Sequence, residues 1–187
     1  MKSLTSKSRA AVGLTVSVVF MGLMAVPNRV QGAAACRLDR EQWQQTTSVQ
    51  LGGTRFLGQT FVNNRPGRVC QVKVYIAKTN PAAGPLTLSV LNVANVVIDS
   101  ATIAGVAIPM GASVQLFDFE CDGAPLAGAP FRLKLESPAS VLGHYRWFGS
   151  GANPFDAGQA WSNTTGVWKP LSNGGADFMF KIYMCNP

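Results

Sequence analysis

The segment from His144 to Trp168 contains most of the side chains in this sequence that could bind a ligand. Sugars present flat C–H faces that stack on aromatic rings, and their hydroxyl groups hydrogen-bond to acidic, amide and guanidinium side chains. The segment supplies both kinds of group between glycines and asparagines. It therefore predicts a carbohydrate-binding site formed by Arg146, Trp147, Asp156, Trp161, Asn163 and Trp168.

A packing role is the alternative for these aromatic residues. Tryptophan is usually largely buried in folded domains, so one or two of Tyr145, Trp147 and Trp168 are expected to close the edge of the core instead. Both interpretations remain open at the level of sequence.

The sequence contains few residues that could act in catalysis, with one histidine and nine acidic residues. Asp118 and Glu120 share a strand face, which invites comparison with the paired carboxylates of glycoside hydrolases, but this spacing is more typical of a solvated outer face. The single histidine, His144, has no serine or cysteine nucleophile motif beside it, and we interpret it as a loop hydrogen-bonding group. We expect a non-enzymatic protein without a cofactor.

Four cysteines, Cys36, Cys70, Cys121 and Cys185, lie far apart in the sequence. Zinc sites usually use closely spaced cysteine or histidine pairs, so no metal site is predicted. Residues 1–35 resemble a secretory signal, as described below, and cysteines of exported proteins usually form disulfides. Alternation places Cys70 and Cys121 on the apolar faces of their strands, one at a strand start and the other at a strand end. This predicts a Cys70–Cys121 disulfide and a second one, Cys36–Cys185, that clamps the N-terminal segment onto the last strand.

Residues 1–35 have the pattern of a secretory signal peptide. Three basic residues, an apolar run over residues 11–26 and the small residues before Cys36 follow one another in the expected order. We predict cleavage near Ala35, a secreted protein in the periplasm or outside the cell, and no stable membrane insertion after the signal is removed. An uncleaved anchor is less favoured because the run is short for a spanning helix. A lipoprotein is also less favoured, because Ala33 occupies the position where a lipobox has a leucine-like residue.

Most of the net positive charge belongs to this leader. Removing Lys2, Lys7, Arg9 and Arg29, which no acidic residue accompanies, lowers the formal charge from +7 to +3. The remaining basic residues are scattered rather than clustered. Because nucleic-acid binding needs basic side chains gathered on one face, we exclude nucleic acid as a partner.

Strand patterns dominate the rest of the 187 residues. From Phe56 onward, alternating apolar segments recur about every ten residues with glycine and proline between them, as in an antiparallel sandwich. We expect an all-β, disulfide-stapled antiparallel β-sandwich of the jelly-roll type over residues 55–187. Residues 36–54 are expected to form a polar N-terminal segment with at most a short helical turn. The first and last strands are expected to lie side by side.

The order of several short motifs supports a family resemblance over about residues 55–185. Gln59-Thr60-Phe61-Val62 precedes Gly84-Pro85-Leu86-Thr87-Leu88-Ser89-Val90, and Tyr145-Arg146-Trp147 precedes Asp177-Phe178-Met179-Phe180. This series resembles the jelly-roll accessory domains of bacterial exported proteins, which are similar to galactose-binding-like and carbohydrate-binding modules. The resemblance implies a two-sheet sandwich and a glycan or cell-surface ligand. Many such modules hold a structural calcium ion, for which Asp39, Glu41 and Asp177 are available, although nothing here resembles a dedicated calcium loop.

Together these observations predict a secreted, non-catalytic binding module for carbohydrate or cell-envelope glycan. The alternative is a structural or adhesive cell-surface or matrix protein that acts through protein contacts.

Overall fold

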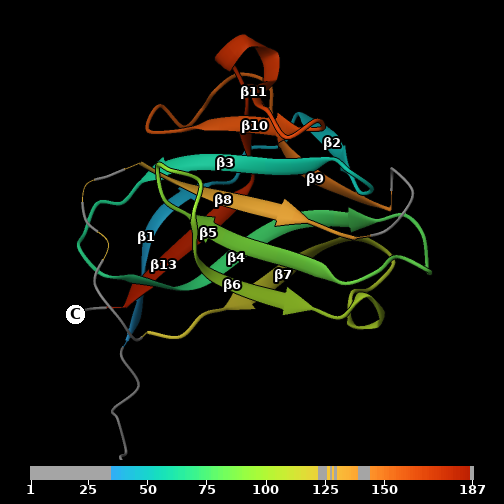
Figure 1. The fold of residues 1–187 in the computed structure, drawn as a ribbon, viewed down its shortest axis with the longest axis horizontal. Coiled ribbons are helices and arrows are strands. Elements are labelled where there is room, and N and C mark those ends of the chain that lie inside the picture. Colours follow the sequence, from blue (N-terminus) through green and yellow to red (C-terminus); the bar gives the residue numbers. More distant parts are fainter. Residues whose placement is uncertain (1–34, 122–125, 127, 129, 139–143, 186–187) are drawn as a thin grey trace, which may run out of the picture. The chain divides into compact units, whose positions relative to one another are not determined.

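A computed structural model describes residues 35–121, 126, 128, 130–138 and 144–185. All of these lie in one compact unit, residues 32–187. The predicted signal peptide lies outside the described residues apart from Ala35. The described chain forms two antiparallel sheets, which confirms the predicted all-β sandwich (Figure 1). Within the described ranges the only helices are two short 3-10 turns, so no helix there has the length or apolarity of a membrane span.

The first sheet is organised around β4 (Arg68–Lys78), the longest strand. One side of β4 pairs with β7 (Gly111–Asp118), and the other side pairs with β13 (Phe180–Cys185) and β9 (Tyr145–Ser150). The sheet is completed by three further strands: β1 (Cys36–Gln42) beside β13, and β2 (Thr47–Leu51) and β12 (Asp177–Phe178) beside β9.

The second sheet has a simple linear order. It runs β11 (Trp168–Pro170), β10 (Gln159–Asn163), β3 (Phe56–Val62), β8 (Pro130–Glu136), β5 (Leu86–Leu91) and β6 (Val97–Ile103). The 3-10 turn η1 (Gly105–Ala107) follows β6, and η2 (Leu171–Gly174) follows β11.

Alternation along the strands builds one core between the sheets. In β4 the side chains of Val72, Val74 and Ile76 are fully buried, and in β8 those of Leu133 and Leu135 are as well. Intervening residues of these strands are partly exposed, as a period of two requires. The result is an apolar interior with two separate outer sheet faces.

The N-terminal segment differs from the sequence expectation. Residues 36–54 contain two strands, β1 and β2, rather than a polar segment with a helical turn. Both lie at margins of the first sheet and pair with one neighbour each, so much of their surface is exposed and their sequence shows little apolar alternation. The expected neighbourhood of the first and last strands is confirmed, because Cys36 lies opposite Cys185 in the β1–β13 ladder.

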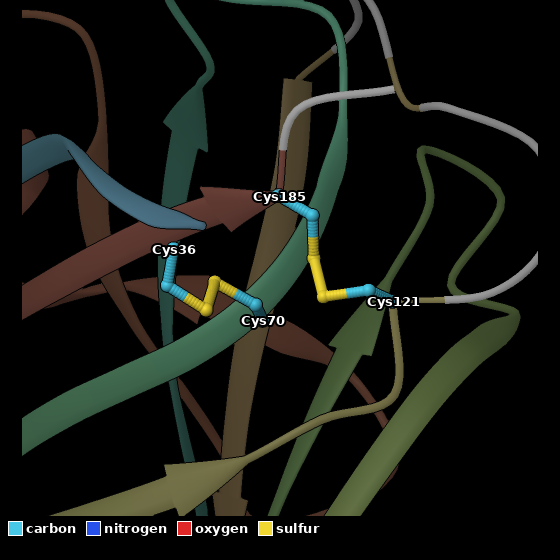
Figure 2. Close-up of side chains that lie close together, drawn as sticks. All are labelled: Cys36, Cys70, Cys121 and Cys185. Atoms are coloured by element: carbon cyan, nitrogen blue, oxygen red, sulfur yellow. A yellow bond between two sulfur atoms is a disulfide. The ribbon is translucent and has the colours of Figure 1, made fainter. Parts of the chain in front are cut away.

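All four cysteines form disulfides, but the predicted pairing is wrong. The disulfides are Cys36–Cys70 and Cys121–Cys185 (Figure 2). A register shift between Tyr183 and Met184 breaks the strict alternation of β13. Cys185 is therefore buried, 2% exposed, instead of lying on the outer face, and it bonds to Cys121.

Candidate ligand-binding face

A tight hairpin brings Trp161 and Trp168 onto one surface. The sequence pattern predicts one irregular strand over residues 160–168, whereas the chain turns back between β10 and β11. Gly166 occupies the left-handed region at φ +82°, which glycine adopts readily. As a result Trp168 lies opposite Asn163, and Trp161 lies opposite Pro170.

Arg132 of β8 links the two indole rings on the outer face of the second sheet. Its guanidinium carbon lies 5.0 Å from the ring centre of Trp161 and 4.5 Å from that of Trp168. Two residues along β8, the Lys134 ammonium lies 4.4 Å from the ring centre of Phe56. We call these five residues the tryptophan–arginine face. Each of its three aromatic rings contacts a cation, an arrangement that holds the rings in place at a wet surface.

Gly58 in β3 allows this close stacking. A Cβ atom at this position would lie 2.8 Å from Cζ3 of Trp168 and 3.1 Å from Cδ of Arg132. Any larger residue would therefore displace the ring or the guanidinium. The sequence shows Gly58 and Arg132 plainly, but nothing in their spacing indicates that they meet Trp168, and the site prediction missed both.

Polar groups accompany the rings. Arg132 donates a hydrogen bond through Nη1 to Oδ1 of Asn95, and partial burial lowers the pKa of its guanidinium. Farther across the same sheet the hydroxyl oxygens of Thr87 and Thr102 lie 2.8 Å apart and are exposed. The outer face thus passes from aromatic rings and cations at one end to hydroxyl groups at the other.

The remaining predicted binding residues do not join this cluster. Trp147 is fully buried, stacks on Phe178 with ring centres 4.3 Å apart, and donates from Nε1 to the Met179 carbonyl oxygen at 2.9 Å. Trp147 therefore has the packing role that the sequence left open. Arg146 is exposed on β9 in the other sheet, and Asp156 is exposed in the loop before β10. Asn163 lies next to Trp168 but is only 6% exposed.

Asp177 is a buried polar link between the sheets. Its carboxylate accepts hydrogen bonds from Nε2 of Gln59 at 2.8 Å and from the backbone N–H of Phe155 at 2.9 Å. Burial raises the pKa of this carboxyl group and nearby Asp156 adds to the rise, while the two hydrogen bonds oppose it. Gln59 also accepts from the Phe178 N–H at 2.8 Å, so both sheets depend on this pair.

The acidic residues considered for calcium have other partners. Asp39 accepts from the backbone N–H of Asn64 at 2.9 Å, and Glu41 forms a 2.9 Å ion pair with Lys181 that raises the lysine pKa. In the part of the chain that the structure describes, one group of three or more side chains is close enough to share a metal ion, and it consists of the four cysteines.

The carboxylates considered for catalysis lie along a groove of about 580 Å³ between β6 and β7. Asp118 and Glu120 line it from one side and Asp99 from the other. Asp118 accepts from Nε2 of Gln71 at 2.8 Å, and Asp99 lies 3.5 Å from the Arg68 guanidinium. Both aspartates thus have a polar partner at the margin of the sandwich.

The outer face of the first sheet is built differently. Trp43, Tyr75 and Phe148 form a continuous row, with ring centres 6.3 and 4.8 Å apart. Val114 and Leu116 extend the row on β7 and are 48% and 40% exposed. We call these five residues the aromatic–aliphatic face. A hollow of about 420 Å³ lies over it, between Trp43, Tyr75 and Val114.

Comparison of the sequence with protein-family models found no match, and comparison with curated proteins found none either. The function must therefore be inferred from the residues of the chain itself.

Proposed function

We propose that the protein is a secreted, non-catalytic binding module whose ligand is a carbohydrate or cell-envelope glycan. The observation that carries this proposal is the Trp161–Arg132–Trp168 stack on the outer face of the second sheet. Two half-buried indole rings on paired strands offer apolar surface for the C–H faces of sugar rings.

The surroundings of the stack suit a polar ligand. Arg132 and Lys134 supply hydrogen-bond donors beside the rings, and the exposed hydroxyls of Thr87 and Thr102 continue along the sheet. A glycan lying across the strands would meet stacking surface first and hydroxyl groups next. Secretion fits the two disulfides, which persist in oxidising compartments.

The test is a titration of the purified protein against a panel of polysaccharides and envelope glycans, followed by tryptophan fluorescence and calorimetry. We expect saturable binding that is lost in Trp161→Ala and Trp168→Ala. The matched control is Trp43→Ala, which removes an exposed tryptophan from the opposite outer face and should leave binding unchanged. Absence of binding across the panel, or loss of binding in Trp43→Ala alone, would contradict the proposal.

Protein contact is the second candidate function, and the aromatic–aliphatic face is the observation that favours it. Contiguous apolar side chains of this kind, three of them exposed (Trp43, Val114 and Leu116) and two half-buried (Tyr75 and Phe148), are typical of association surfaces. Under this alternative the protein self-associates, and its sedimentation coefficient rises with concentration. Leu116→Lys would then reduce the rise, whereas Trp161→Ala would not. A concentration-independent monomer would remove this candidate.

A further inference from the structure

The four cysteines meet in one corner of the sandwich although they are widely separated in the sequence. All four Sγ atoms lie within 4.8 Å of one another (Figure 2). The sequence argument against a metal site rested on the distances along the chain between these residues, and the topology removes that argument. What remains is a compact group of four sulfur atoms supplied by four separate segments.

The sheets, and not only the disulfides, fix this corner. Cys36 faces Cys185 in the β1–β13 ladder, and Cys185 faces Arg68 in the neighbouring β13–β4 ladder. The Cys70 carbonyl oxygen accepts a hydrogen bond from the Phe119 N–H at 2.8 Å, which holds the end of β7 beside β4. These backbone contacts do not involve sulfur. They therefore keep Cys36, Cys70 and Cys185 on neighbouring strands when the disulfides are open, and they hold Phe119, two residues before Cys121, beside Cys70.

We propose that, in its reduced form, this cluster binds a single thiophilic divalent ion of the Zn²⁺ class through four thiolates. A Zn–S bond of about 2.3 Å places the sulfurs of a tetrahedral site about 3.8 Å apart. The most distant sulfurs here need to approach by about 1 Å. The two sulfurs of each disulfide, about 2 Å apart while bonded, need to separate by slightly less than about 2 Å once the bond opens. Rotation of the cysteine side chains between rotamers supplies movements of this size. Four thiolates with no histidine or water complete the coordination shell, so the site is structural rather than catalytic.

The metal-bound and disulfide forms exclude each other because they use the same sulfur atoms. Opening both disulfides takes four electrons and four protons. Two equivalents of a dithiol supply both and are oxidised to disulfides, whereas two equivalents of a phosphine supply the electrons and become phosphine oxide, with water giving the oxygen and the protons. Binding of the ion then displaces the four thiol protons. A reducing compartment favours the metal-bound form, and an oxidising compartment favours the two disulfides.

The experiment uses the full chain, reduced with a phosphine, freed of the reductant without air, and titrated with Co²⁺. We expect the visible ligand-field bands and the near-ultraviolet charge-transfer band of tetrahedral cobalt thiolate. Both should saturate at one ion per chain and be abolished by one equivalent of Zn²⁺. The disulfide-bonded protein should give no such bands.

Variants assign the ligands. Each of Cys36→Ser, Cys70→Ser, Cys121→Ser and Cys185→Ser should shift the charge-transfer band and weaken the binding of cobalt. Glu120→Gln is the matched control, since it changes the exposed residue beside Cys121 without removing a sulfur, and it should titrate like the unmodified protein.

Reduction could unfold the chain before the metal is added. Circular dichroism recorded before and after metal addition measures whether the chain is folded in each state. Recovery of the β-sheet signal with one equivalent of metal would support the proposal. A reduced chain that gives only the pale spectrum of octahedral cobalt would overturn it, whether that chain is folded or unfolded. Equal cobalt binding by a variant with all four cysteines replaced would overturn it as well.

Discussion

The two outer faces of the sandwich both present aromatic side chains, but the rings of the two faces differ in their main contacts. On the tryptophan–arginine face the rings contact cations, with Arg132 between two indoles and Lys134 over Phe56. On the aromatic–aliphatic face the rings contact one another and continue into exposed Val114 and Leu116. Lys181 reaches the ring of Trp43 at the margin of that row.

This difference in contacts bears on the chemistry of a ligand that each face could bind. Rings that alternate with cations keep hydrogen-bond donors beside every stacking surface, as a hydroxyl-bearing ligand requires. Contiguous rings and aliphatic groups gain most when water is excluded altogether, which a protein surface achieves better than a sugar. This difference is the basis on which we propose a glycan as the ligand of the tryptophan–arginine face, with protein contact through the aromatic–aliphatic face as the second candidate.

The largest effect on the free energy of unfolding is expected in the core between the two sheets. Trp147→Ala removes a fully buried ring, its stack on Phe178 and its hydrogen bond to Met179. We expect it to lower the free energy of unfolding by about 4 kcal/mol. Trp161→Ala, on the surface, should cost only about 1 kcal/mol. Urea denaturation of both variants with intact disulfides measures the contrast, and equal losses would show that Trp161 is a core residue.

The next largest effect concerns the polar link beneath both faces. Gln59→Leu leaves the Asp177 carboxylate without one donor and the Phe178 N–H without its acceptor. Unsatisfied buried groups of this kind cost about 1–3 kcal/mol each, so we expect a loss of about 3 kcal/mol. Both sheets should lose stability in one cooperative step, because the link joins them. Separate transitions for the two sheets in hydrogen exchange would contradict this expectation.

A pH series on Asp177 should give a smaller effect with a definite sign. Because burial raises its pKa in the folded protein, the folded state binds the proton more tightly than the unfolded state. This contribution stabilises the fold fully below the unfolded pKa of about 4 and is lost as the pH rises through the raised folded pKa. Asp177→Asn lacks it.

The measurement is the difference in unfolding free energy between the protein and Asp177→Asn from pH 3.5 to 7. The variant should be about 1–2 kcal/mol less stable near pH 4. Its side-chain amide brings an N–H donor into a site where Nε2 of Gln59 already donates, so one of the two donors loses its acceptor. The difference should shrink as the pH rises. A difference that grows with pH would mean that Asp177 has a lowered pKa.

Strand alternation predicted much of the fold and, applied strictly, would have corrected the site. Arg146 and Trp147 are adjacent on one strand, so they point to opposite sides of the sheet and cannot share a face. Tyr145 and Trp147 share the buried side, as their spacing implies. The residue that does meet Trp161 and Trp168 is Arg132, from β8, with β3 lying between β8 and β10. Such a meeting depends on strand order, which periodicity does not reveal.

The cysteine pairing failed for a related reason. One register shift in β13 moves Cys185 from the outer face of the sheet to the buried face. No residue type near Tyr183 or Met184 indicates this shift in the sequence. The sequence analysis missed the two strands of the N-terminal segment because they lie at the margins of a sheet. Strands at a margin are exposed on much of their surface, so their residues are mostly polar and do not alternate with apolar ones. Interior strands are thus readable from sequence, whereas margins and bulges depend on their neighbours.

The variant with the smallest expected change in stability best distinguishes the roles of the two faces. Gly58→Ala adds one carbon atom 2.8 Å from the ring of Trp168 and 3.1 Å from Cδ of Arg132, so the ring must tilt off the sheet. We expect a loss of about 1 kcal/mol and a shift in tryptophan emission, because both indole environments change. Glycan binding should weaken together with this shift. Self-association through Leu116 should stay as it is, since Gly58 lies on the other sheet. If glycan binding survived while the emission shifted, the ligand would not be stacking on Trp168. The tryptophan–arginine stack would then be a stabilising contact of the fold rather than a binding platform.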